Sequence, residues 1–267
     1  GVMTRLGLEP ERLLEMYPEL VICSISGYGQ TGPMRDFPGH DLTYQAVAGS
    51  LSLAKREDGV PVVPGVLNAD LAGGALTGAM RICAALVERA RTGRGCWIDV
   101  SMSDSTLVLN APHVAAAAAM GANPKPGEEV LTGGSERYSL YRCKDGRCVA
   151  FAPLEPKFWD EFCRLTGVAN DAGKEQLCDL FMTRNRDEWT QILTEACCAP
   201  VLELDELEAF PQHVARGRIT RKDDSVRVSH LGAGGDVTAH LPCPRLGEHT
   251  KSALQRVGFE PKRLEEE

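Results

Sequence analysis

Two residues that can carry acid–base chemistry stand at matching places in the chain. His40 lies between Gly39 and Asp41, directly before a segment with helical character. Asp70 comes 30 positions later, in the first turn of another expected helix. Imidazole and carboxyl groups serve as general acids and bases, and helix N-termini favour anionic ligands. The pair therefore indicates proton transfer next to an anionic group, although a loop histidine and a helix-stabilising aspartate would have the same pattern.

A glycine-rich loop before His40 raises the alternative of a dinucleotide site. Gly27, Gly29 and Gly32 form a literal G-x-G-x-x-G after an expected strand at 20–26. In the dinucleotide fingerprint the third glycine opens a helix, and an acidic residue follows about 20 positions later. Here Pro33 follows the third glycine, and the later region has a helical pattern. The sequence therefore favours a turn that shapes the loop over a site for NAD.

Composition narrows the class of protein. The chain has 267 residues, a net charge of −8 and 43% hydrophobic residues, so we expect a folded protein that does not bind nucleic acid. It has neither a run of 18 apolar residues nor a signal-peptide pattern, so we expect no membrane span and a cytoplasmic or organelle-matrix location, mitochondrial or peroxisomal in a eukaryote. Ten scattered cysteines lack C-x-x-C spacing, which favours reduced, buried thiols and no metal site.

The order of expected elements predicts an α/β fold. Helices are expected at 10–20, 41–49, 68–91 and 103–121, the last interrupted at Pro112, and strands at 20–26 and 96–102. A Pro/Gly-rich linker at 121–134 precedes a hairpin turning at Asp145-Gly146, two helices, strands from about 216 to 241 and a terminal helix. We expect part of a large domain at 1–125, a small domain at 126–215, and a return to the large domain with the C-terminal helix at 216–267.

Several segments together resemble one known family. They are GHDLTYQAVAG, PGVLNADLAGGALTGAM, TGRGCWIDVSMSD, KDGRCVAFAPLEPKFW, RNRDEWTQIL, CAPVLELDE and PRLGEHT. Their content and order resemble the class III CoA-transferase superfamily (CaiB/BaiF proteins), and within it the α-methylacyl-CoA racemase branch. The resemblance implies a large Rossmann-like CoA-binding domain, a smaller α+β domain and an interlocked homodimer.

The resemblance also implies residue roles. The catalytic histidine of a GHD motif and the aspartate of a D-[FL]-x-G-G motif fall on His40 and Asp70. A glutamate in an LEP motif, which hydrogen-bonds the histidine, falls on Glu155, and the arginine of G-V-x-x-R-L-G-L, which binds CoA phosphate, falls on Arg5. Further contacts with substrate or CoA are expected from Gly39, Asp41, Tyr44, Gly73, Gly74 and Tyr138. For Asp41 a role as cap of the helix that it begins is favoured.

The implied reaction is inversion of the 2-methyl centre of an acyl-CoA thioester. One group removes the α-proton from one face, the other returns a proton to the opposite face, and N–H donors at the helix beginning near Asp70 hold the enolate oxygen. No cofactor is implied beyond the CoA of the substrate. The alternative is a CoA-transferase, in which Asp70 attacks an acyl-CoA and passes CoA between carboxylates. Such an enzyme needs Asp70 but not His40.

One departure from the family pattern opens a second alternative. Family members normally carry an N-terminal Rossmann-like βα region before the G-V-x-x-R-L-G-L segment, and here that segment begins the sequence. We expect either a fragment or a chain that has lost those elements. In the latter case the protein would be a non-catalytic paralogue that keeps the dimer and binds CoA poorly.

Overall fold

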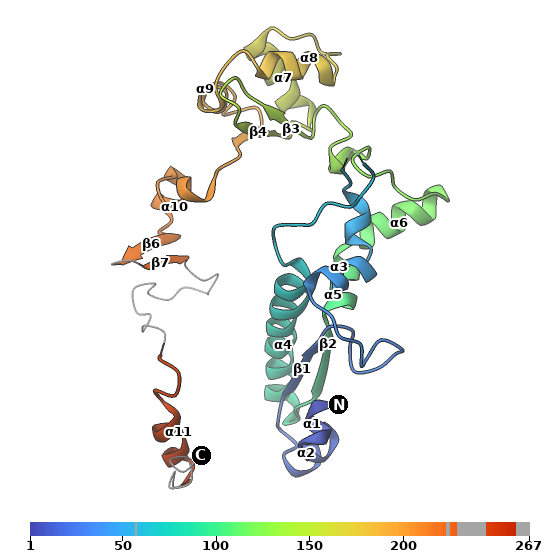
Figure 1. The fold of residues 1–267 in the computed structure, drawn as a ribbon, viewed down its shortest axis with the longest axis vertical. Helices are drawn as coiled ribbons and strands as arrows, with labels where there is room; N and C mark the ends of the chain where they lie inside the picture. Colours follow the sequence, from blue (N-terminus) through green and yellow to red (C-terminus); the bar gives the residue numbers. More distant parts are fainter. Residues whose placement is uncertain (57, 223–224, 229–243, 260–267) are drawn as a thin grey trace. The chain divides into compact units, whose positions relative to one another are not determined.

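A computed structural model describes residues 1–56, 58–222, 225–228 and 244–259 (Figure 1). The chain forms two compact units, Gly1–Val201 and Leu202–Glu267. The structure mixes helices with sheets, as expected from the sequence. The domain limits expected at 125 and 215 stay predictions.

The first unit begins with a parallel pair of strands. After the short helices α1 (Val2–Arg5) and α2 (Pro10–Met16), β1 (Ile22–Ser26) pairs with β2 (Trp97–Ser101), with Ile22 opposite Trp97. Parallel strands require a crossover, and here it contains helices. They are α3 (Asp41–Val47), the 3₁₀ turn η1 (Ser50–Leu53), η2 (Ala69–Leu76) and α4 (Thr77–Thr92). The expected strands and the α/β order of this part are confirmed.

The long helix expected at 68–91 runs over 69–92 and has two parts. Its first part, η2, is a π-helix that passes directly into the α-helix α4. Gly93 ends it with φ 70°, the left-handed conformation typical of a helix C-terminus. By length and composition alone Ala69–Thr92 is apolar enough to cross a bilayer, but it packs along β1 and β2, so no membrane span is evident.

The predicted interruption near Pro112 separates two helices. Helix α5 (Met102–Leu109) ends before Asn110, and α6 (Ala111–Met120) carries Pro112 in its first turn, where the missing N–H costs nothing. The Asn110 side-chain amide donates to the Ala48 carbonyl and to the Ser50 hydroxyl, both at 2.8 Å. These bonds tie the end of α5 to the end of α3.

A second core forms later in the first unit. Strands β3 (Ser139–Arg142), β4 (Cys148–Phe151) and β5 (Cys198–Pro200) make an antiparallel sheet in that order, and the hairpin expected at Asp145-Gly146 is confirmed. The 3₁₀ turn η3 (Val130–Thr132) precedes it, and helices α7 (Pro156–Thr166), α8 (Lys174–Phe181) and α9 (Arg186–Ile192) contribute aromatic residues to its core. The rings of Phe151 and Phe162, for example, lie 4.6 Å apart.

The second unit is made of short elements. It contains η4 (Leu204–Glu206), α10 (Pro211–Ala215), the antiparallel pair β6 (Ile219–Lys222) and β7 (Ser225–Val228), and α11 (Thr250–Arg256). The strands expected from 216 are confirmed as far as 228. The remainder of that prediction, 229–241, falls outside the described residues.

The cysteines only partly fit the expectation of buried thiols. Nine are free in the described part of the chain, but four of them are exposed, and for these the predicted burial is wrong: Cys83, Cys96, Cys178 and Cys197. Burial raises the pKa of Cys143 to about 11 and that of Cys198 to about 12. Within the described ranges, no three His, Cys, Asp or Glu side chains gather as metal ligands.

Candidate active site

The glycine-rich loop leads from β1 to His40. Gly29 and Gly32 have φ of 86° and 82°, conformations that other residues rarely adopt, and no helix begins at Gly32. The fingerprint of a dinucleotide site is therefore incomplete in the structure as well. The backbone N–H of Gln30 donates to Asp99 Oδ2 on β2 at 2.9 Å. This bond fastens the loop to the neighbouring strand, and from there the chain continues to His40.

His40 is the residue that begins α3. Its backbone is extended, with φ −138° and ψ 172°. Its N–H donates to Thr43 Oγ1 at 3.0 Å, and the Thr43 hydroxyl donates back to the His40 carbonyl at 2.8 Å. Thr43 therefore supplies the cap of α3, and His40 is exposed with no hydrogen bond to its ring among the described residues. The imidazole is accessible from solvent at a helix N-terminus.

Asp41 caps the N-terminus of η2, whereas the sequence predicted that it caps α3. It is 6% exposed, and its Oδ1 accepts the backbone N–H of Ala69 at 2.8 Å and of Asp70 at 3.0 Å. Its Oδ2 accepts from Gln45 Nε2 at 2.6 Å. Asp41 thus caps η2, so the interpretation of it as the cap of α3 is wrong, while the ligand contact expected of it stays a prediction. Hydrogen bonds to charged acceptors contribute about 1.5–3 kcal/mol each.

The same bonds bring His40 and Asp70 together. Asp41 is the neighbour of His40 in the chain, and it binds the N–H of Asp70 itself. With standard covalent dimensions this path keeps the Cα atoms of His40 and Asp70 within roughly 12 Å of each other. The amides of residues 69 and 70 are, however, no longer free. They are not available as donors for an enolate oxygen, contrary to the expectation for this helix end.

Tyr44 lies against the same loop. Its ring fits against Gly27 and Gly39: a Cβ at Gly39 would come within 2.5 Å of Tyr44 Cε1 and 2.9 Å of Tyr28 Oη. Burial raises the pKa of Tyr44, and the neighbouring Tyr28 and the Asp70 carboxylate act in the same direction. Gly39 is therefore required for close packing, and Tyr44 lies close to the pair His40 and Asp70.

Gly73 and Gly74 face protein. A Cβ at Gly73 would come within 2.7 Å of the Met102 carbonyl oxygen, and one at Gly74 within 3.0 Å of the Met102 side chain. Both glycines are buried where η2 meets α5. Their position is that of residues that let two helices approach, and the ligand contact expected of them stays a prediction.

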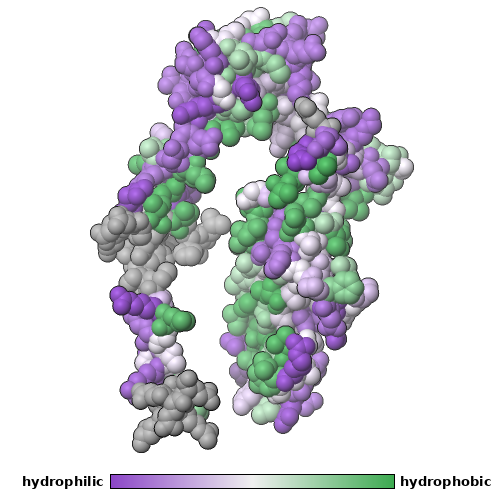
Figure 2. Space-filling model, viewed as in Figure 1, coloured by the Kyte–Doolittle hydropathy of each residue, from purple (hydrophilic) through white to green (hydrophobic). Residues whose placement is uncertain are grey.

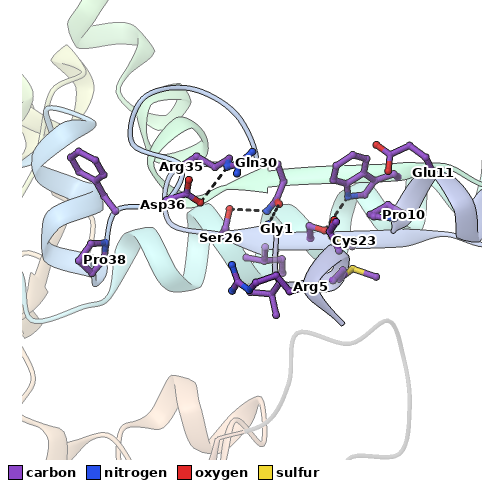
Figure 3. A pocket seen from close by; sticks show the side chains of 18 residues that line it. Gly1, Arg5, Pro10, Glu11, Cys23, Ser26, Gln30, Arg35, Asp36 and Pro38 are labelled. Carbon is purple, nitrogen blue, oxygen red and sulfur yellow. Dashed lines mark hydrogen bonds and ion pairs between the residues drawn. The ribbon is translucent and has the colours of Figure 1, made fainter. Parts of the chain in front are cut away.

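Arg5 lines a pocket of about 910 Å³ between α1, β1 and the glycine-rich loop (Figure 3). Arg35, for which the sequence predicted no role, lines the same pocket, as do Gln30 and Trp97. Arg35 Nε lies 3.3 Å from Asp36 Oδ1, and both side chains are exposed. The pocket therefore combines two guanidinium groups with the aromatic side chains of Phe37 and Trp97 and the carboxylates of Glu11 and Asp36. The sequence gives little indication of this pocket, because Arg35 lies in an irregular loop.

Glu155 and Tyr138 belong to the later part of the first unit. Glu155 is exposed at the N-terminus of α7, where its carbonyl accepts the N–H of Phe158 at 3.0 Å. Within the described part of the chain it makes no hydrogen bond to His40, so the expected contact stays a prediction. Tyr138 lines a second pocket of about 580 Å³, together with Phe151 and Lys174.

Comparison with known proteins gives the family. The model of CoA-transferase family III matches residues 1–250. The chain is 33% identical to the alpha-methylacyl-CoA racemase of Homo sapiens, over 97% of this chain and 72% of that protein. It is 28% identical to the succinyl-CoA:glutarate CoA-transferase of Homo sapiens, over 96% of this chain and 64% of that protein.

Solved structures agree with this result. A CAIB/BAIF family protein from Brucella suis has a TM-score of 0.77 and 26% identity, with 97% of this chain and 73% of that chain covered. Sequence and structure thus give the same answer: the chain belongs to CoA-transferase family III.

Proposed function

We propose that the protein inverts the 2-methyl centre of acyl-CoA thioesters by proton transfer between His40 and Asp70. The observation that carries the proposal is the Asp41 bridge, which joins the residue after His40 to the backbone N–H of Asp70. The identity to a racemase over nearly the whole chain supports the same reaction. Racemase and CoA-transferase relatives both support the broader conclusion that the protein is an enzyme acting on acyl-CoA.

The two groups have complementary tasks. Neutral His40 takes the α-proton from one face of the thioester, and the C–H electron pair becomes part of the enolate. The protonated Asp70 carboxyl then gives its proton to the opposite face of the α-carbon. The turnover ends with His40 charged and Asp70 ionised, and the mirror-image substrate returns both groups to their starting states. Glu155 would fix the tautomer of the imidazole, as carboxylate partners commonly do.

Arg5 would bind the phosphates of CoA in the pocket that it lines with Arg35. Replacing Arg5 by alanine is expected to raise KM for an acyl-CoA by roughly 10–100-fold and to leave kcat nearly unchanged, because one charge-assisted hydrogen bond remote from the reacting carbon is lost. Steady-state kinetics measure this split. Arg12→Ala on the exposed face of α2 is the control, with no expected effect. A lower kcat at constant KM would contradict the assignment of Arg5.

A second function is favoured by the transferase relatives. In a CoA-transferase, Asp70 would attack the thioester carbonyl, form a mixed anhydride and release CoA as its thiolate. The thiolate would attack the Asp70 carbonyl of this anhydride, which expels the first carboxylate and leaves Asp70 as a CoA thioester. The acceptor carboxylate would attack that thioester, form a second mixed anhydride and release the thiolate, which then attacks the acceptor's carbonyl to give the new acyl-CoA and free Asp70. This reaction uses Asp70 and leaves His40 without a required role.

One experiment separates these functions. The protein is incubated with a single enantiomer of a 2-methylacyl-CoA in D₂O, with and without succinate. Deuterium at the α-carbon together with loss of optical purity supports the racemase, and CoA on succinate supports the transferase. Neither product, together with no binding of CoA, supports a non-catalytic relative.

We also propose a homodimer. On η2 and α4, Leu71, Leu76, Met80 and Val87 are 53–65% exposed, and Figure 2 shows hydrophobic residues at the surface of this part. Exposed apolar surface of this extent is typical of protein interfaces, and the racemase-like family pattern implies a second copy as the partner. Analytical ultracentrifugation is expected to give twice the monomer mass. A monomer at micromolar concentration would contradict the proposal.

A further inference from the structure

We propose that Asp41 is a positioning residue: its carboxylate sets the separation of His40 and Asp70 by holding the first turn of η2 against the start of α3. This inference rests on the proposed function for its kinetic readout only. The contact itself exists whichever reaction the site performs. The three hydrogen bonds that the Asp41 carboxylate makes all go to the protein.

The N-terminus of η2 is capped from a distant part of the chain. Helices begin with backbone N–H groups that have no partner within the helix. The N-cap residue Asn68 makes no side-chain cap here. Instead one oxygen of Asp41 accepts two successive amides, at 2.8 and 3.0 Å, across 28 and 29 positions of sequence. A cap supplied from another helix fixes both the end of η2 and its distance from that other helix.

The orientation of the Asp41 carboxylate is fixed by a buried neighbour. Gln45 lies one turn after Asp41 on α3 and is 1% exposed. Its Nε2 donates to Oδ2 at 2.6 Å, which leaves Oδ1 directed at the amides of η2. Gln45 therefore restricts rotation of the Asp41 side chain, and the bridge has one geometry.

The side of η2 that faces α5 is held independently of Asp41. Gly73 packs against Met102 and Thr106 of α5, and Asn110 ties the end of α5 to that of α3. Helices α3, η2 and α5 thus pack against one another, and only the first turn of η2 depends on Asp41 for its position. Removing the bridge is expected to release that turn, and with it Asp70, while the rest of the packing stays in place.

Two variants of Asp41 distinguish the effect of its hydrogen bonds to η2 from the effect of its negative charge. In Asp41→Ala the bridge is lost. In Asp41→Asn the amide oxygen still accepts both N–H groups, while Gln45 can turn its side-chain amide to present Oε1 to the new NH₂.

For inversion of a 2-methylacyl-CoA we expect kcat to fall by about 100-fold in Asp41→Ala with KM unchanged, since small misplacements of a reacting group have effects of this size. In Asp41→Asn we expect kcat within about ten-fold of wild type, because a neutral acceptor makes weaker bonds than a carboxylate. Asp179→Asn, an exposed carboxylate on α8, is the matched control.

Hydrogen–deuterium exchange of the backbone gives a readout that needs no activity. The amides of residues 69 and 70 are expected to exchange faster in Asp41→Ala and at nearly the wild-type rate in Asp41→Asn. An equal loss of kcat in both variants would show that charge matters rather than position, and a raised KM in both would show a ligand contact. Either result, or unchanged exchange of the two amides in Asp41→Ala, overturns the inference. Failure of the proposed function is seen separately, as absence of inversion by the wild-type protein, and amide exchange then decides the positioning role alone.

Discussion

Asp70→Asn is expected to lower the rate of inversion by about 10²–10⁴-fold in both directions, because the amide can neither give nor take the proton on its side of the α-carbon. His40 remains, however, and can remove and return a proton on its own face. Exchange of the α-hydrogen with D₂O should therefore persist for one enantiomer and disappear for the other. Chiral chromatography and mass spectrometry of the recovered thioester measure the two quantities together.

Asp70→Asn also tests the alternative that the protein is a CoA-transferase. Asp70 would be the nucleophile of that reaction, so CoA transfer to succinate should disappear as well. Asp179→Asn again serves as the control, since its carboxylate is exposed on α8. Normal inversion by Asp70→Asn would remove Asp70 from the mechanism altogether.

His40→Ala is expected to lower inversion by a similar factor of about 10²–10⁴, and to preserve hydrogen exchange for the enantiomer that Asp70→Asn does not exchange. The reason is geometric: with the imidazole gone, the remaining carboxylate reaches only the opposite face. CoA transfer, in contrast, requires no imidazole and should continue if the protein is a transferase. The measurement is the same pair of assays with each enantiomer supplied separately.

The opposite selectivity of the two variants is the sharpest sign of two groups acting on two faces. His113→Ala on α6 is the control for loss of an imidazole elsewhere. If His40→Ala and Asp70→Asn exchanged the same enantiomer, both groups would act on one face, and the proposed inversion would be wrong. Full CoA transfer by His40→Ala without any inversion in the wild type would favour the transferase.

Much of the local structure could be predicted because its causes are local. The strand at 22–26 follows from a run of apolar residues, the end of α4 from Gly93, and the division between α5 and α6 from Pro112. The order of strand, crossover helices and parallel strand also gave the α/β arrangement. The proximity of His40 and Asp70 was predicted through the family pattern, and hydrogen bonds now account for it.

The remaining features depend on contacts between distant parts of the chain. An aspartate before a helix is a sound candidate for its cap, and nothing in the neighbouring residues shows that Thr43 takes that task while Asp41 serves η2. Gly73 and Gly74 likewise could admit a ligand or a helix, and only the tertiary structure shows Met102 in that space. Arg35 lines the same pocket as Arg5 because of the path of an irregular loop, which the sequence does not predict.

The cap that Asp41 gives to η2 also bears on the order of folding. The start of α5, in contrast, is capped by a nearby residue, because Ser101 accepts the N–H of Asp104 at 3.1 Å, and such a contact can form as soon as the local segment becomes helical. The N-terminus of η2 has no cap until α3 packs against it, because the capping carboxylate of Asp41 belongs to α3. We therefore expect His40 and Asp70 to reach their final separation only when α3 and η2 have packed together.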